Sequence, residues 1–89
     1  MPDEIVVFAE PVVKHHPKEW DRWEVELPEL GLVAYEETKQ AATDKLIKLF
    51  RSFVQVHRSK CTLEQWLTKA GVTWGYVSDF PGVKSRFRG

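Results

Sequence analysis

Cysteine, glycine-rich loops and long apolar runs are scarce in this 89-residue chain. The single cysteine, Cys61, has no partner for an internal disulfide or for half of a zinc site. No apolar run approaches the roughly 20 residues that a membrane-spanning helix needs. The start, Met1-Pro2-Asp3-Glu4, lacks the basic and apolar regions of a secretory signal, so we expect a cytoplasmic protein without membrane contact. No cofactor fingerprint is present, and we expect no cofactor.

Hydrophobic residues make up 43% of the chain and aromatic residues 12%, which argues against disorder. A domain of this size buries roughly 60 to 65 per cent of its unfolded surface. That is enough for one sheet packed on a helix, so we expect a single domain whose stability is modest or shared with a partner.

The clearest pattern lies in residues 23–35. Apolar and acidic residues alternate from Trp23 to Leu27, as in a strand with one face on a core and one in water. Pro28 ends that strand because it has no backbone donor. Gly31 permits a reversal, and residues 32–35 return as a second hydrophobic strand. The sequence therefore predicts two antiparallel strands that lead into a helix.

The remaining elements follow from spacing. Ile5–Phe8 predicts a first strand that continues through Pro11 to Val13, followed by a polar loop over 14–19 and a strand over 20–27. Thr38 can cap a helix that runs to Arg58, and its apolar stripe is Ala42, Leu46, Leu49, Phe50, Phe53 and His57.

A second, short helix is predicted after Thr62, its expected cap, and Gly71 ends it. Residues 72–77 then predict a fourth strand. We expect an α+β fold: an antiparallel β-β-β-α sheet with the long helix packed on one face, then the short helix and the fourth strand. Residues 1–79 form this domain, and residues 80–89 are a basic C-terminal tail outside the core.

The run WEVELPELGLVAYEETKQAATDKL resembles the N-terminal domain of HicB-family antitoxins, in which an acidic, proline- and glycine-containing turn joins two strands that precede a threonine-initiated helix. The matching residues are Trp23, Val25, Glu26, Leu27, Pro28, Glu29, Leu30, Gly31, Val33, Thr38 and Ala42. The turn is shorter than the family's, and Glu36-Glu37 replaces a glycine that commonly precedes the threonine. Nothing after Val77 has the length of a DNA-binding module, so operator repression is not expected.

The resemblance implies a degenerate ribonuclease H-like fold without a catalytic metal site. It also implies a dimer or tetramer that binds and neutralises a HicA-type, mRNA-cleaving toxin, or an orphan domain of that kind. The residues of this chain also lack the groups that a catalytic metal site needs. A ribonuclease H site needs several converging carboxylates, whereas Glu24 and Glu26 fall on the polar, solvated side of their strand. His15 and His16 point to opposite sides of an extended segment, so we expect no metal site and no enzymatic activity.

Charge is distributed unevenly along a chain of zero net charge. Residues 1–37 carry ten acidic and three basic side chains, net −7, and residues 38–89 carry the reverse, net +7. This asymmetry favours self-pairing, and we expect a homodimer or higher homo-oligomer.

The helix cations, with Lys84, Arg86 and Arg88 of the tail, suggest a phosphate-contacting surface. Trp23, Trp66 and Trp74 fall on apolar faces and are expected in the core, whereas Trp20 adjoins a polar loop. The candidate residues for binding a partner or nucleic acid are Lys45, Lys48, Arg51, Arg58 and Trp20. We expect a non-catalytic HicB-like binding protein. The alternative is a small nucleic-acid-binding domain that uses the basic helix and tail, although the neutral chain favours only weak nucleic-acid binding.

Overall fold

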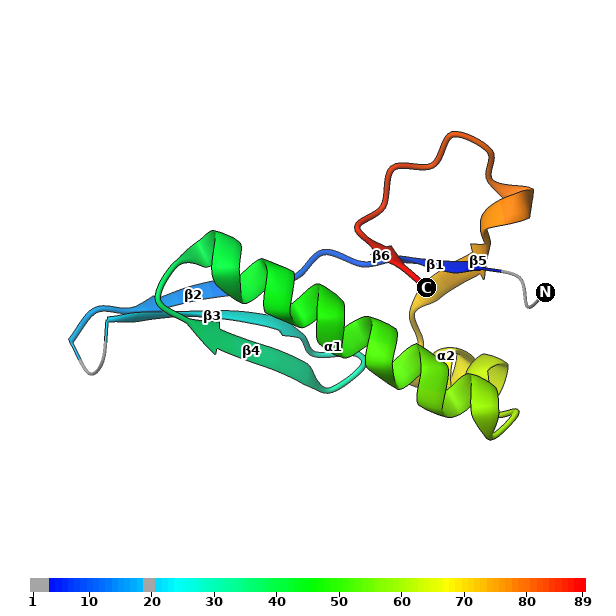
Figure 1. Cartoon of the computed structure of the whole chain (residues 1–89), viewed down its shortest axis with the longest axis horizontal. Coiled ribbons are helices and arrows are strands. Elements are labelled where there is room, and N and C mark those ends of the chain that lie inside the picture. The colour runs from blue at the N-terminus through cyan, green and yellow to red at the C-terminus, as the bar shows by residue number, and fades with distance from the viewer. Residues whose placement is uncertain (1–3, 19–20) are drawn as a thin grey trace.

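Strands come first along the chain, and two helices separate them from the last strands (Figure 1). The computed structural model describes residues 4–18 and 21–89. Its elements are β1 (Ile5–Phe8), β2 (Val12–His16), β3 (Arg22–Leu27), β4 (Leu32–Glu36), α1 (Lys39–Ser59), α2 (Leu63–Ala70), β5 (Thr73–Tyr76), a 3-10 turn at Val77–Asp79, and β6 (Phe87–Arg88). The chain is an α+β protein, as the sequence predicts.

The strands form two antiparallel sheets, with strand orders β2-β3-β4 and β5-β1-β6. The predicted continuation of the first strand through Pro11 is wrong, because the chain leaves β1 at Phe8 and re-enters a strand at Val12. Proline lacks a backbone donor, so Pro11 cannot extend the ladder. The predicted loop over 14–19 is also wrong for Lys14–His16, which pair with β3.

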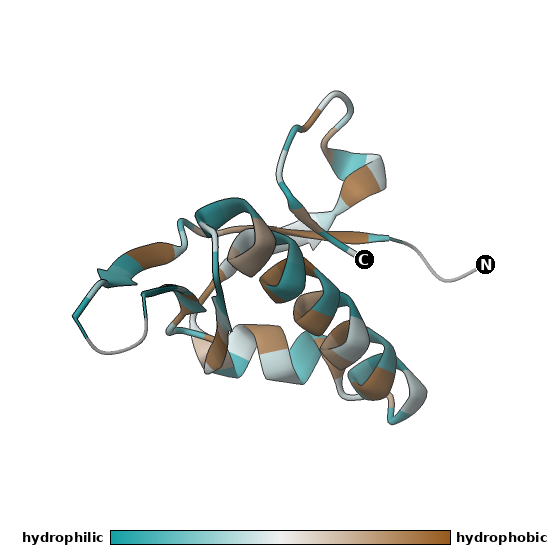
Figure 2. Cartoon of the chain, turned by 60° about the vertical axis from the view of Figure 1, so that its left-hand side comes forward, coloured by the Kyte–Doolittle hydropathy of each residue, from teal (hydrophilic) through white to brown (hydrophobic). Residues whose placement is uncertain are grey.

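The core lies where α1 packs against one face of β3 and β4 and then passes β6 and α2 (Figure 1). Apolar and polar residues alternate around α1 (Figure 2). The fully or almost fully buried side chains include Val25, Leu27, Leu32, Ala34, Ala42, Leu46, Phe50 and Val54. The predicted stripe is correct at Ala42, Leu46 and Phe50, but Val54 rather than Phe53 is buried near its end. Phe53 is 42% exposed, and its ring stacks on Trp66 of α2.

The helix ends follow the predictions in part. The Thr38 hydroxyl accepts a hydrogen bond from the Ala41 amide at 3.1 Å, which confirms this cap. Gly71 ends α2 in the left-handed conformation, with φ of 78°. Thr62 makes no side-chain cap to α2, because its hydroxyl bonds to the His57 ring at 2.8 Å instead.

The predicted C-terminal tail is instead part of the fold. β6 pairs antiparallel with β1, and Gly89 exchanges backbone hydrogen bonds with Ile5. Phe87 is only 3% exposed, and its ring meets Phe50 edge-on at a centroid distance of 5.6 Å. The pairing partner of β6 is the edge of β1. Because β1 lies near the other end of the sequence, residues 80–89 alone do not reveal this pairing. Within the described residues, no helix is long and apolar enough to cross a membrane.

Candidate binding sites

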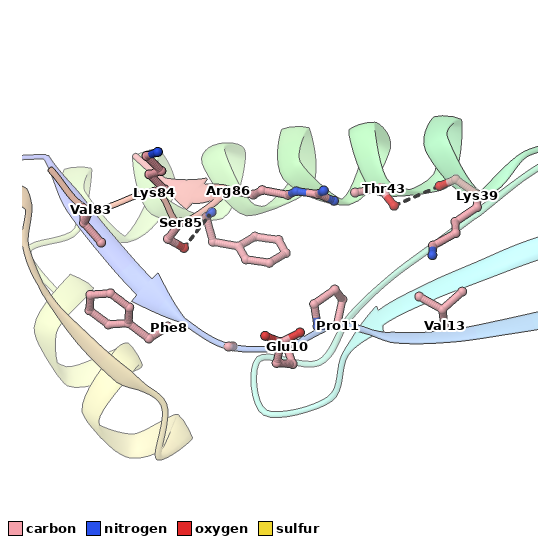
Figure 3. A pocket seen from close by; sticks show the side chains of 12 residues that line it. Phe8, Glu10, Pro11, Val13, Lys39, Thr43, Val83, Lys84, Ser85 and Arg86 are labelled. Carbon is pink, nitrogen blue, oxygen red and sulfur yellow. Dashed lines mark hydrogen bonds between the residues drawn. The ribbon is translucent and has the colours of Figure 1, made fainter.

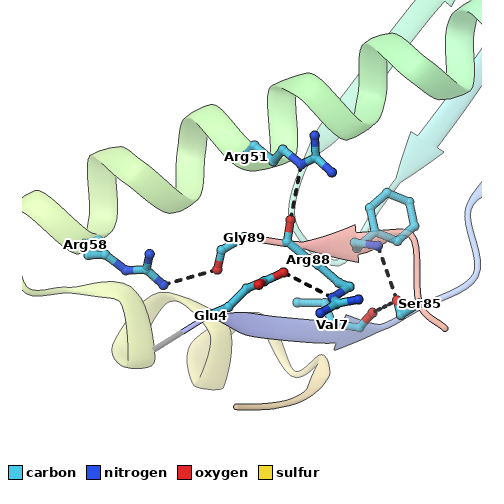
Figure 4. A network of polar contacts seen from close by, with 8 residues as sticks. Glu4, Val7, Arg51, Arg58, Ser85, Arg88 and Gly89 are labelled. Carbon is cyan, nitrogen blue, oxygen red and sulfur yellow. Dashed lines mark hydrogen bonds and ion pairs between the residues drawn. The ribbon is translucent and has the colours of Figure 1, made fainter. Parts of the chain in front are cut away.

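The cations of α1 do not form one surface. Lys45 lies on the side of α1 next to β4, where its Nζ is 3.8 Å from Glu36 Oε1. Lys48 is exposed and has no ion pair among the described residues. Arg51 and Arg58 turn toward β6 (Figure 4). The predicted phosphate-binding helix is therefore divided between two flanks.

Arg51 and Arg58 bind the backbone of the C-terminal segment (Figure 4). Arg51 Nε donates to the Arg88 carbonyl at 3.4 Å, and Arg58 Nη2 donates to the Gly89 carbonyl at 3.2 Å. Arg88 Nε lies 3.1 Å from Glu4 Oε1, and the Ser85 hydroxyl donates to the Val7 carbonyl at 2.8 Å. These contacts attach β6 to both α1 and β1, so both arginines have a structural role.

The tryptophans expected in the core are only partly buried. Trp23, Trp66 and Trp74 each pack against the core cluster while keeping some exposure. Trp66 also stacks on His57, with ring centroids 4.4 Å apart. Trp20 lies outside the described residues, so its predicted interface role stays a prediction.

The face of β2-β3-β4 that points away from α1 has an unusual polar centre. Val25 and Ala34 are buried beneath α1, so Glu24 and Tyr35 point to the other face. We call this the open sheet face; it comprises Val12, Lys14, His16, Arg22, Glu24, Glu26, Val33 and Tyr35. The prediction that Glu24 is solvated is wrong, since it is 9% exposed. Strand pairing places it between Lys14 and Tyr35, which cover it.

Polar contacts hold the Glu24 carboxylate in place. His16 Nε2 lies 3.1 Å from Glu24 Oε1. Partial desolvation raises the pKa of Tyr35, and the Glu24 charge, the hydrogen bond to Glu24 and the Glu26 charge raise it further. Tyr35 is therefore a neutral hydrogen-bond donor at physiological pH. Val12 is 41% exposed and Tyr35 is 37% exposed, so the face that holds this carboxylate also exposes apolar surface.

The adjacent histidines lie on opposite faces of β2. His15 stacks on Trp23 with ring centroids 4.3 Å apart, and its Nε2 is 3.0 Å from Asp21 Oδ1. His16 faces Glu24 on the other side. The described part of the chain contains no group of three or more His, Cys, Asp or Glu residues arranged to hold a metal ion.

A cleft of about 720 Å³ opens where β1 passes into β2, beside the start of α1 and the segment before β6 (Figure 3). Its lining combines apolar residues with the polar residues Glu10, Lys39, Thr43, Lys84, Ser85 and Arg86. Arg86 extends toward Thr43 and the first turn of α1, with Glu10 on the opposite wall (Figure 3).

Lys39, Lys84 and Arg86 are visible as cations in the sequence, but nothing local predicts that they share a cleft. The pairing of β6 with β1 carries residues 83–87 to the beginning of α1 and so creates the site.

Comparisons of the chain with protein-family models, with curated proteins and with solved structures give no match.

Proposed function

We propose that this chain is a non-catalytic, HicB-like protein-binding domain, acting as the antitoxin of a HicA-type mRNA-cleaving toxin or as an orphan of that kind. The element order supports the proposal. Two antiparallel strands joined by the Pro28–Gly31 turn lead into a helix capped by Thr38, which is the pattern of the resemblance.

The open sheet face is the observation that carries this proposal. Aromatic side chains are enriched in protein interfaces, and Tyr35 stands there among exposed valine surface. Glu24 and Glu26 place two carboxylates on the same face, which also carries the cations Lys14 and Arg22. An mRNA-cleaving toxin must bind a polyanion and so carries cations, which makes its surface complementary to these carboxylates.

The same contacts support a role without catalysis. Glu24 accepts a hydrogen bond from Tyr35 and has its Oε1 3.1 Å from His16 Nε2, so this carboxylate already has polar partners. Metal-dependent hydrolysis of a phosphodiester needs several free carboxylates directed at one point. Glu26 alone remains on this face, which is too few for such a site.

Calorimetric titration of the chain with a HicA-type mRNA-cleaving toxin, sought first in the reading frames next to this chain's gene, tests the proposal. Val12→Lys with Glu26→Lys should weaken binding at least about tenfold, because it adds cations to the centre of the contact. Gln55→Lys, on the exposed side of α1, is the control and should bind within about twofold of the unmodified chain. Equal affinity for all three proteins would contradict the assignment of this face.

We also propose self-association, because β2 and β4 are sheet edges and the two halves of the chain carry opposite charge. Sedimentation equilibrium at micromolar concentration should give a mass near twice that of the 10.4 kDa chain. A monomer throughout would remove this part of the proposal.

The second candidate is nucleic-acid binding, which the gathering of Lys39, Lys84 and Arg86 in the cleft favours. It ranks second because three of the four helix cations first considered have internal partners. Single-stranded RNA should therefore bind weakly at about 150 mM salt, where screening acts over about 8 Å. Lys48→Ala tests the helix without disturbing β6, and it should leave that weak affinity nearly unchanged.

A further inference from the structure

We propose that the cleft is a second binding site, separate from the open sheet face, and that it takes an extended acidic segment of a partner protein. Its two walls are residues 9–11, between β1 and β2, and residues 83–86, before β6. Cations from these walls and from α1 would hold the carboxylates of that segment.

Arg86 provides the first reason. The structure describes all five arginines, and four have a polar partner: Arg22 near Glu36, Arg88 near Glu4, and Arg51 and Arg58 on backbone carbonyls. Arg86 is exposed and has no such partner among the described residues. A guanidinium matches a carboxylate through two parallel hydrogen bonds, so Arg86 is available for a ligand of that geometry.

Lys39 and Lys84 strengthen the positive charge of the cleft. Neither forms an ion pair within the described residues, and both line the same cleft as Arg86. Glu10 is the only acidic residue in the lining, so cations exceed carboxylates by two. The cleft therefore attracts an anionic ligand, while Glu10 opposes a ligand that carries a phosphate at every position.

The backbone distinguishes a peptide from a nucleic acid. Ala9, Glu10 and residues 84–86 make no backbone-to-backbone hydrogen bonds within the described chain. An extended peptide carries both donors and acceptors and can pair with such segments, as in β-strand addition. A phosphate backbone offers acceptors only, so it can pair with the N–H groups of both walls but not with their carbonyl groups, which would stay bonded to water.

The apolar part of the lining favours apolar side chains between the acidic ones of the ligand. It includes Pro11, Val13, Val83 and Phe87, together with Phe8, which is 37% exposed. Side chains of an extended segment alternate between two faces. One face can therefore place carboxylates near Arg86 and Lys39 while the other contacts this apolar surface.

A fluorescein-labelled peptide of sequence EVEVEVEV is the probe, titrated by anisotropy with the full chain at about 150 mM salt. We expect saturable binding that weakens at least about tenfold when Lys39→Glu is combined with Arg86→Glu. Lys60→Glu with Lys69→Glu is the control, because it makes the same change in net charge at exposed positions outside the cleft. This control should retain affinity within about twofold.

Several outcomes would overturn the proposal. They are no saturable peptide binding, an equal loss in the control, and tighter binding of a ten-nucleotide oligouridine than of the peptide. Loss of self-association in the variant with Lys39→Glu and Arg86→Glu would also overturn it, because it would show that a second copy of the chain occupies the cleft. If the double variant unfolds, Arg86→Gln replaces it and must still weaken binding. No toxin enters this assay, so its failure leaves the proposed function intact.

Discussion

At the scale of single residues, the main departure from expectation is Glu24. The alternation around it correctly predicts which side of β3 is polar, because a strand places neighbouring side chains on opposite faces. Its burial depends on Lys14 and Tyr35, which lie opposite it on the adjacent strands, and strand register decides which residues those are. A single-strand pattern carries no information about those partners.

Tyr35 gives a direct test of this arrangement. Desolvation and the Glu24 charge raise its pKa, so the neutral phenol should persist above the ordinary value of about 10. Glu24→Gln should lower that pKa toward the ordinary value, because it removes the nearest negative charge. Absorbance titration in a Tyr76→Phe background isolates Tyr35, and an unchanged pKa in Glu24→Gln would contradict the contact.

The raised pKa of Tyr35 also determines in which direction the stability of the fold changes with pH. The folded state holds the phenolic proton more tightly than the unfolded state, so the contribution of Tyr35 is complete below a pH of about 10. It is lost as the pH rises through the raised, folded-state pKa. In urea unfolding, the Glu24→Gln variant should lose less free energy of unfolding than the unmodified chain as the pH rises through that pKa.

At the scale of elements, the strands β3 and β4, the helix α1 and the cap at Thr38 could be predicted from the sequence, because each depends on local periodicity or on a turn residue. β6 could not. It contains only two residues, and its partner β1 lies near the other end of the chain. The cleft depends on that pairing, so its combination of Lys39 and Arg86 was equally hidden.

Phe87 should contribute strongly to stability although it lies in the segment expected to be a tail. Phe87→Ala removes a ring that is 3% exposed and packs on Phe50, so it should lower the free energy of unfolding by roughly 3 kcal/mol. Phe80→Ala is the matched control. That ring is 41% exposed, and its loss should cost about 1 kcal/mol or less. Equal urea midpoints for the two variants would show that β6 is not held in the core.

At the scale of the whole molecule, the uneven charge along the sequence corresponds to two different surfaces. The acidic first half supplies β3 and its carboxylates on the open sheet face. The basic second half supplies Lys84 and Arg86 to the cleft, together with Lys39 from the start of α1. A chain of zero net charge can thus carry a cationic cleft as well as a sheet face that holds both carboxylates and cations, which net charge alone does not reveal.

The most direct test of the central claim is to map amide chemical shifts of the isotope-labelled chain as the unlabelled HicA-type toxin is added. We expect the shifts to concentrate on the open sheet face, at Val12, Val33 and Tyr35, while Lys48 and Gln55 on the exposed side of α1 stay unchanged. Shifts confined to α1, or no shifts at toxin concentrations that saturate binding in calorimetry, would contradict the assignment of this face as the protein-binding surface.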